Sequence, residues 1–110
     1  MTASILIADD NEDLRKVLAW LLQPRGYETL QAATGKEAIE KAIAAQPSLI
    51  LLDVHLPDMN GADAARAIKK DQRTTHIPIV GWSAYFAERC REEELRAGMV
   101  AYMKNHFQRQ

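Results

Sequence analysis

Residues 5–10 read Ile-Leu-Ile-Ala-Asp-Asp, an apolar run that ends in two carboxylates. Residues 49–53, Leu-Ile-Leu-Leu-Asp, and residues 79–83, Ile-Val-Gly-Trp-Ser, have the same form. An apolar run of this length that ends in a polar residue is typical of a buried parallel strand. In an open α/β sheet, the carboxyl ends of such strands form the edge where ligands bind. The sequence therefore predicts that carboxylates and a hydroxyl group converge at one edge of a parallel sheet.

Strand and helix patterns alternate along the chain, which is typical of a parallel sheet with helices on its faces. The expected strands are residues 4–8, 28–32, 48–52, 77–82 and 100–103. The expected helices are residues 12–23, two helices capped by Thr34 and Asn60, and residues 86–97. Apolar side chains at helical spacing are expected to face the sheet: Leu14, Val17, Leu18, Leu21, Ala38, Ile39, Ala42, Ile43, Ala64, Ala65 and Ile68. We therefore expect one α/β domain over residues 1–110.

The composition narrows the classes of protein to which the chain can belong. It has 110 residues and a formal net charge of -1 at pH 7, which gives no reason to expect nucleic-acid or membrane binding. The single cysteine, Cys90, excludes an intramolecular disulfide and fits a reducing compartment. The first apolar run is too short for a signal peptide, and no apolar stretch approaches the ~20 residues of a membrane span. We expect a cytoplasmic protein with no nucleic-acid or membrane partner.

Asp9, Asp10 and Asp53 are expected to lie together at the sheet edge. Neighbouring carboxylates repel one another, which raises their pKa values unless a cation neutralises them. Mg²⁺ suits this environment because it takes oxygen ligands and commonly binds one or two carboxylates together with a phosphate. A carboxylate beside Mg²⁺ can act as the nucleophile for a phosphoryl group, and the Ser83 hydroxyl can donate to a phosphoryl oxygen. The alternative is that each aspartate merely caps the next helix, as Asp10 could; the occurrence of the set at three strand ends favours the metal and phosphoryl site.

Four motifs then occur in register along residues 4–107. They are ILIADDNED at residues 5–13, DVHLPDMNG at residues 53–61, PIVGWSA at residues 78–84 and GMVAY at residues 98–102. By these motifs the sequence resembles the receiver domain of two-component response regulators. The resemblance implies a three-layer flavodoxin-like fold of the (βα)5 type, with a parallel five-stranded sheet in the order 2-1-3-4-5.

The resemblance also implies roles for the polar residues of the site. Asp53 becomes the acceptor of a phosphoryl group from a histidine kinase or phosphotransfer protein. Asp10 becomes a direct ligand of Mg²⁺, or of Mn²⁺ in its place, and Asp9 acts largely outside the direct coordination of the ion. The backbone carbonyl of His55 supplies a further protein ligand. The remaining ligand oxygen comes from Asp53 itself.

The same resemblance implies how a signal would leave the site. Ser83 and Tyr102 are the switch pair, since the hydroxyl moves toward the phosphoryl oxygens and the ring turns into the vacated space. His55 and Tyr85 occupy variable positions that tune the lifetime of the phosphoryl group. A downstream protein would bind the surface of the fourth helix and fifth strand, which the switch reshapes.

The sequence departs from the family pattern at its fifth strand. The family usually has a lysine followed by a proline where this chain has Asn105 and His106. Asn105 can donate a hydrogen bond to a phosphoryl oxygen but brings no charge. Lys104 is the adjacent candidate substitute, although side chains alternate along a strand. Without the proline we expect a trans bond between residues 105 and 106, because a cis bond before a non-proline residue costs ~3 kcal/mol.

The sequence given contains only Gln108-Arg-Gln110 after Phe107, whereas the family continues into a fifth helix. We therefore expect that helix to be missing and apolar surface beside the first helix and fifth strand to be open. Exposed contiguous apolar patches commonly mark interaction sites. A homodimer through this open face is the resulting expectation, with a truncated chain as the alternative.

Three functional classes compete. The first is a phosphorylatable receiver with no enzymatic activity beyond self-phosphorylation and slow self-dephosphorylation. The second is a degenerate receiver that serves as a phosphorylation-independent interaction module, which the replacement of the lysine by Asn105 favours. The third is a phosphohydrolase, which has little support because no second aspartate follows two residues after Asp9 or Asp53. No Gly-rich loop follows a strand, which argues against a nucleotide-binding fold.

Overall fold

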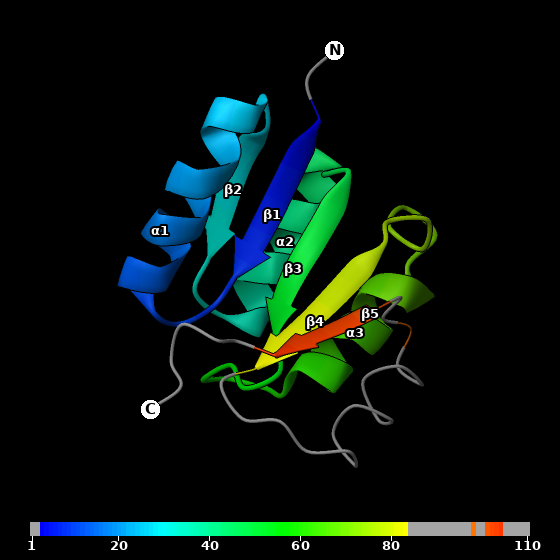
Figure 1. The fold of residues 1–110 in the computed structure, drawn as a ribbon. Coiled ribbons are helices and arrows are strands. Elements are labelled where there is room, and N and C mark those ends of the chain that lie inside the picture. Colours follow the sequence, from blue (N-terminus) through cyan, green and yellow to red (C-terminus); the bar gives the residue numbers. More distant parts are fainter. Residues whose placement is uncertain (1–2, 84–97, 99–100, 105–110) are drawn as a thin grey trace.

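The chain folds into a parallel five-stranded sheet in the order β2-β1-β3-β4-β5 (Figure 1). The computed structural model describes residues 3–83, Gly98 and residues 101–104, with Ser83 and 101–104 described by their backbone only. The elements are β1 Ser4–Ala8, α1 Glu12–Leu22, the 3-10 helix Gln23–Arg25, β2 Glu28–Ala32, α2 Gly35–Ala45, β3 Leu49–Asp53, α3 Gly61–Lys70, β4 Ile79–Ser83 and β5 Ala101–Lys104. The predicted α/β fold and strand order are confirmed. The predicted helix at 86–97, the backbone of residues 105–106 and the chain beyond Phe107 lie outside the described residues.

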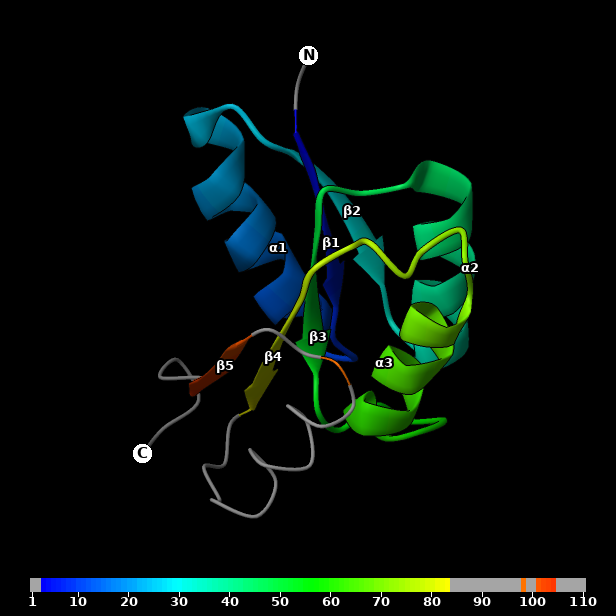
Figure 2. The same cartoon turned by 90° about the vertical axis from the view of Figure 1, so that its right-hand side faces the viewer.

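The sheet is the middle of three layers. Figure 2 shows α1 on one face of the sheet and α2 and α3 together on the other. Alternate residues of the strands serve the two faces: Leu6 and Ile50 pack with α2 and α3, whereas Ile7 and Leu51 pack with α1. Because both faces are covered, nearly every residue of these strands must be apolar, which is why the strands are continuous apolar runs. Their ends are the first positions at which polar side chains can be tolerated.

β3 and β4 end one residue later than the sequence indicated. β3 runs to Asp53 and β4 to Ser83, where the predicted strands stopped at residues 52 and 82. The reason is pairing: Asp53 lies opposite Trp82 in the ladder, and Ser83 lies opposite Lys104. Asp53 and Ser83 are thus the last residues of their strands, and the sheet itself fixes their backbone positions.

Side chains cap the three described α-helices at their N-termini. The Asn11, Thr34 and Asn60 side chains accept from the backbone N–H groups three residues later, at 3.1, 3.0 and 2.8 Å. The predicted caps at Thr34 and Asn60 are confirmed. In a capping box, the Glu37 carboxylate would accept from the backbone N–H of Thr34. Here it accepts instead from the Ala33 N–H, at 2.7 Å. These caps fix where each helix starts, close to the carboxyl edge of the sheet.

The burial of α1 differs from the prediction. Leu14 and Leu18 are buried, but Val17 is 42% exposed and Leu21 is only half-buried. The buried stripe is rotated toward Ala19, which is 6% exposed. Arg15 of the same helix donates to the carbonyl oxygen of Asp9, directly after β1, and to the side chain of Gln31 on β2.

The helices on the opposite face follow the prediction more closely. Ala38 and Ala42 of α2 are fully buried, whereas Ile39 and Ile43 are half-buried. In α3, the predicted inward residues are all fully buried: Ala64, Ala65 and Ile68. Small side chains at these positions let the helices lie close to the strands, so this half of the core is fully buried.

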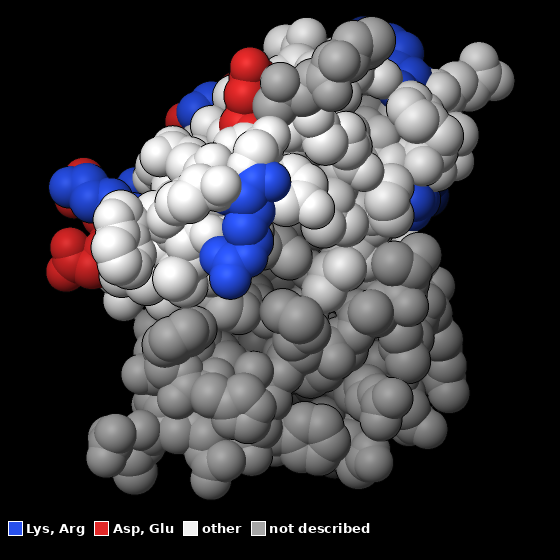
Figure 3. All heavy atoms as spheres, turned by 45° about the horizontal axis from the view of Figure 1, so that its top comes forward, with Lys and Arg blue, Asp and Glu red and all other residues white. Residues whose placement is uncertain are grey.

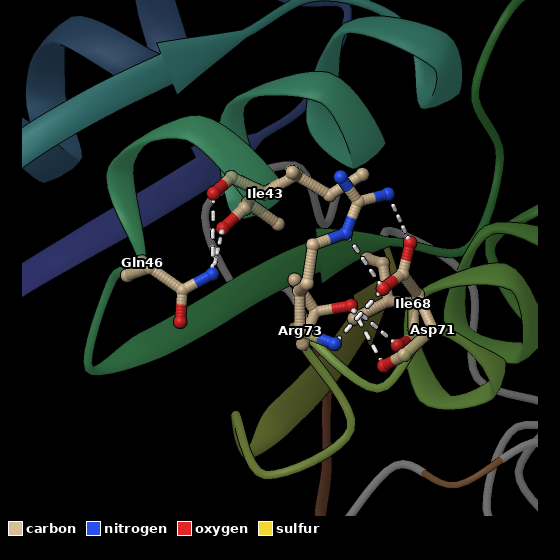
Figure 4. A network of polar contacts seen from close by, with 7 residues as sticks. Ile43, Gln46, Ile68, Asp71 and Arg73 are labelled. Carbon is tan, nitrogen blue, oxygen red and sulfur yellow. Dashed lines mark hydrogen bonds and ion pairs between the residues drawn. The ribbon is translucent and has the colours of Figure 1, made fainter.

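The connection from α3 to β4 is held by local polar contacts (Figure 4). The Asp71 carboxylate accepts from the Arg73 guanidinium at 2.7 Å, which with the Arg73 backbone N–H holds the pKa of Asp71 down at about 2. The buried Thr74 hydroxyl donates to the carbonyl oxygen of Ile68 at 2.6 Å. The same view shows the Gln46 amide turned back onto the end of α2, where it donates to the Ile43 carbonyl at 3.1 Å. These contacts close the end of the molecule opposite the polar strand ends.

Charged side chains of both signs are dispersed over the described surface. In Figure 3 the described part of this face is largely uncharged, and basic and acidic groups lie side by side at its left margin. Among the described residues, no helix has the length and apolar character needed to cross a bilayer.

Gly61 is expected to be irreplaceable because a Cβ atom there would lie 2.6 Å from the carbonyl oxygen of Asp53 and 2.7 Å from Cα of Val54. We predict that Gly61→Ala lowers the free energy of unfolding by about 2–3 kcal/mol, measured by urea denaturation, because backbone atoms must move. Gly35→Ala is the matched control, since Gly35 also begins a helix but its Cβ would meet only the flexible Met59 side chain. A smaller loss for Gly61→Ala than for Gly35→Ala would contradict the steric argument.

Candidate phosphoryl and metal site

Three carboxylates meet at the carboxyl edge of the sheet. Asp9, Asp10 and Asp53 each place a carboxylate oxygen within 4.8 Å of the other two. β1 and β3 are neighbours and pair Ala8 with Leu52, so the residues that follow this pair are brought side by side. Asp9 is buried, Asp53 is half-buried and Asp10 is exposed. The cluster is therefore open to solvent on the Asp10 side and closed beneath.

Asp9 is held by hydrogen bonds at its backbone and its side chain. Its N–H donates to the carbonyl oxygen of Ala32 at 3.0 Å, and its Oδ1 accepts from the Asn11 N–H at 2.8 Å. Its carbonyl oxygen accepts from the Arg15 guanidinium at 2.6 Å. These contacts tie the β1–α1 connection to the edge strand β2 and to the body of α1.

Asp53 is held by the connection that follows it. Its Oδ1 accepts from the His55 N–H at 3.1 Å, and the next residue, Val54, donates to the Trp82 carbonyl at 3.0 Å. Val54 also accepts from the Gly61 N–H at 2.8 Å, which closes the loop at the start of α3. The loop therefore has little freedom, and the carboxylate of Asp53 points toward the other acids.

The charges of the site are unfavourable in the absence of a cation. The pKa of Asp53 is raised to about 7, first by desolvation and then by the charges of Asp9 and Asp10. Burial likewise raises the pKa of Asp9, against the lowering effect of the Asn11 hydrogen bond. For Asp9 and Asp53 the expected rise in pKa is confirmed in direction, but its first cause is burial, with repulsion between the carboxylates a smaller one.

The donor set fits a hard divalent cation. All three groups are carboxylates, and one face of the cluster is open, so that an ion could keep water ligands as Mg²⁺ prefers. A cation would neutralise charge that burial makes costly. The carbonyl of His55 lies two residues beyond Asp53 in an exposed turn, and its role as a ligand remains a prediction.

The other predicted site residues are described in part or not at all. Ser83 ends β4 and Lys104 ends β5, and the two are ladder partners at the same edge as Asp53. Tyr102 pairs with Gly81, and this pair lies two residues before the pair of Ser83 and Lys104. Their side chains, together with Tyr85 and Asn105, lie outside the described residues. The roles assigned to them remain predictions.

The sequence reading missed two residues that shape the site. One is Arg15. It could have been predicted, because a long basic side chain one turn into the helix after Asp10 leans back toward the helix N-terminus and so toward Asp9. Asp58 is the other, since its carboxylate accepts from the N–H groups of Gly35 at 2.7 Å and Lys36 at 2.9 Å. These bonds lower the pKa of Asp58 and fasten the loop after Asp53 to the start of α2. A partner more than twenty residues away gave no local signal.

Comparison with known proteins agrees with this architecture. The family model of the response regulator receiver domain matches residues 5–110. The polar-differentiation response regulator DivK of Brucella ovis is 38% identical over 98 residues, which cover 89% of this chain and 79% of that protein. The chemotaxis protein CheY4 of Vibrio cholerae superposes with a TM-score of 0.91 at 28% identity, covering 97% of this chain and 89% of that one.

A further solved structure bears on the acidic cluster. The receiver domain of the sensor histidine kinase PA1611 from Pseudomonas aeruginosa has a magnesium ion coordinated in its active-site cleft. It superposes with a TM-score of 0.87 at 30% identity and covers 97% of this chain and 88% of that one.

The raised pKa of Asp53 predicts a pH-dependent stability in the absence of metal. A carboxyl whose folded pKa lies above its unfolded value of 3.8 contributes full stability below that value and loses it as pH rises through about 7. Asp53→Asn removes the charge, so at pH 8 in EDTA we expect its free energy of unfolding to exceed that of the unsubstituted chain by on the order of 2 kcal/mol.

Urea denaturation at about pH 4.5 and about pH 8, each with EDTA or with Mg²⁺, measures this difference. These two pH values lie about one unit above the unfolded and the folded pKa of Asp53, respectively. The gain should shrink at the lower pH and in Mg²⁺, because protonation or the cation removes the same repulsion. Glu40→Gln, an acid-to-amide change on the exposed side of α2, is the control and should show no such pattern. Equal stability of Asp53→Asn and the unsubstituted chain at pH 8 in EDTA would contradict the prediction.

Proposed function

The chain belongs to the response regulator receiver domains of two-component systems, and we propose that it accepts a phosphoryl group on Asp53 from a phosphohistidine protein. The observation that carries this proposal is the group of three carboxylates within 4.8 Å, in which Asp53 is half-buried at the end of β3. Receiver domains are signalling modules, and they bind Mg²⁺ at an acidic site. The roles of the individual residues as phosphoryl acceptor, metal ligands, switch pair and tuning positions are our proposal for this chain.

In the proposed reaction, a carboxylate oxygen of Asp53 attacks the phosphorus of the phosphohistidine. A P–O bond forms, the P–N bond breaks, and the electron pair returns to the imidazole nitrogen of the donor, which takes up a proton. The nucleophile must be ionised, so a pKa near 7 makes neutralisation by a cation valuable at neutral pH. The same site then loses the group slowly to water, and no other substrate is involved.

Asp9, Asp10 and Asp53, with the carbonyl of His55, are the residues that would hold the ion. Bound Mg²⁺ supplies charge neutralisation for the phosphoryl oxygens and the acids. Mn²⁺ has the same preference for oxygen ligands and is proposed as a substitute. The rigid turn after Asp53 keeps the nucleophile in place while the exposed Asp10 side leaves room for the donor.

The output is proposed to run through β4 and β5. Ser83 and Lys104 are ladder partners at the edge where Asp53 lies, so a phosphoryl group there would be one strand from Ser83 and two strands from Lys104. Ser83 with Tyr102 would form the switch, and Asn105 or Lys104 would take the place of the usual lysine. His55 and Tyr85 would tune the lifetime of the phosphoryl group. A downstream protein would read the surface at β5 and the segment before it.

The second candidate is a degenerate receiver that binds its partner without phosphorylation. The observation in its favour is the sequence at residues 104–106, where the family's lysine and proline are replaced. In that case the acidic cluster would still bind a cation, but the switch would not respond to it.

We predict that incubation with acetyl phosphate and Mg²⁺ adds the mass of one phosphoryl group, detected by intact-mass spectrometry. Asp53→Ala and omission of the metal should each abolish the gain, because the first removes the nucleophile and the second leaves the acids unneutralised. The matched control is Asp63→Ala, an exposed acid in the first turn of α3, which should be phosphorylated as usual. No gain in a chain shown to be folded would favour the degenerate receiver.

We also propose that a second copy of the chain covers the outer side of α1. Val17 is 42% and Trp20 72% exposed there, and Leu49 and Val80 on the same sheet face are only half-buried. Apolar side chains exposed together commonly mark an interaction surface.

Sedimentation analysis at tens of micromolar tests this pairing. The unsubstituted chain should sediment as a dimer, and Trp20→Glu should sediment as a monomer because it buries a charge in the contact. Ala44→Glu, on the exposed side of α2, is the control and should leave the dimer intact. A monomer that unfolds cooperatively in the unsubstituted chain would refute the proposal.

A further inference from the structure

Arg15 makes a forked contact beneath the acidic cluster. Its Nη1 donates to the carbonyl oxygen of Asp9 at 2.6 Å, and its Nε donates to the side-chain oxygen of Gln31 at 3.0 Å. The guanidinium is half-buried between α1 and the edge strand β2. A planar group with several donors in fixed directions can hold two acceptors at once in one geometry. The contact therefore fixes the position of the Asp9 carbonyl relative to the sheet.

The carbonyl of Asp9 belongs to the peptide bond that joins Asp9 to Asp10. Because a peptide unit is planar, holding its oxygen also holds the N–H and Cα of Asp10. The flanking contacts act in the same sense: the Asp9 N–H is bonded to Ala32, and Asn11 is engaged as the cap of α1. Asp10 is exposed, so the direction of its carboxylate depends on the backbone that carries it.

We propose that Arg15 is a positioning residue for the cation: it orients the peptide between Asp9 and Asp10 so that the Asp10 carboxylate faces Asp53. This inference rests on the proposed function, because it assumes that the acidic cluster binds Mg²⁺. Gln31 is the second anchor of the same fork. Its backbone carbonyl is bonded separately to the Lys41 ammonium, so the strand itself does not depend on the fork.

The charge of Arg15 and its geometry have opposite effects on metal binding, which makes the inference testable. A guanidinium near the site repels a divalent cation, so removal of its charge alone should tighten Mg²⁺ binding. Loss of positioning should weaken it. Arg15→Lys keeps the charge but not the planar fork, Arg15→Gln removes both, and Gln31→Met removes one anchor without changing any charge.

Isothermal titration with Mg²⁺ alone measures the dissociation constant of each variant. We expect Arg15→Lys to raise it by about tenfold, as loss of an orienting partner commonly does. Arg15→Gln should raise it by less, because loss of the charge offsets part of the effect, and Gln31→Met should also raise it by less than Arg15→Lys. Phosphorylation by acetyl phosphate should recover in both Arg15 variants at saturating Mg²⁺, because the nucleophile is untouched. Arg66→Lys and Arg66→Gln, at an exposed arginine of α3 paired with Asp63, are the controls and should leave the constant unchanged.

The outcomes separate this inference from the function on which it rests. Unchanged binding in Arg15→Lys, with tighter binding in Arg15→Gln, would show that Arg15 acts by charge alone and would overturn the inference. If thermal unfolding shows that the Arg15 variants do not fold, Gln31→Met decides: weaker binding supports positioning, and unchanged binding refutes it. Absence of Mg²⁺ binding in the unsubstituted chain would overturn the metal site itself and the positioning role with it.

Discussion

The rest of the structure depends on the crowding of three carboxylates at one edge of the sheet. Burial raises the pKa of Asp53 and of Asp9, and the neighbouring charges add to that effect. A flexible chain would relieve such strain by moving the acids apart. The sheet prevents this, because β1 and β3 are adjacent and their ends are fixed by the ladder. The unfavourable electrostatics are therefore maintained by the hydrophobic core, whose strands have no freedom to shift register without exposing a whole apolar face.

The acids are restrained by different devices. Asp53 is restrained from the chain that follows it, through the His55 N–H and the closure at Gly61. Asp9 and Asp10 are restrained from outside their own segment, by Ala32 on β2 and Arg15 on α1. Under the proposed function this difference matters, because a nucleophile needs a fixed direction whereas a metal site must tolerate binding and release. Asp58 also fastens the loop after Asp53 to the start of α2. The loop after β1 and the loop after β3 are therefore each hydrogen-bonded to a helix, the first to α1 and the second to α2.

The sequence predicted the features that depend on local pattern. The convergence of Asp9, Asp10 and Asp53 follows from apolar runs that end in acids, because in a parallel sheet all such ends lie at one edge. The strand order was implied by the resemblance to receiver domains and not by these runs. The exposure of Val17 was not predicted, since helical periodicity does not register distant contacts such as the one from Arg15 to Gln31 on β2. Asp58 was missed for the same reason, since its partners at the start of α2 are distant in the chain. The ends of β3 and β4 shifted because the ladder pairs polar residues that periodicity assigns to a loop.

The buried part of the sheet and its carboxyl edge differ in the free energy that their contacts contribute. Away from the acids, small residues such as Ala64 and Ala65 pack against fully buried strands and supply favourable contacts. At the carboxyl edge, by contrast, burial raises the pKa values of Asp9 and Asp53. Asp53 pairs with Trp82 in the neighbouring strand β4, so a change of charge at Asp53 occurs directly beside that strand. The unfavourable charges are therefore gathered where a cation can neutralise them. A site built in this way is suited to signalling, because occupation of the acids alters the stability of the strands beside them.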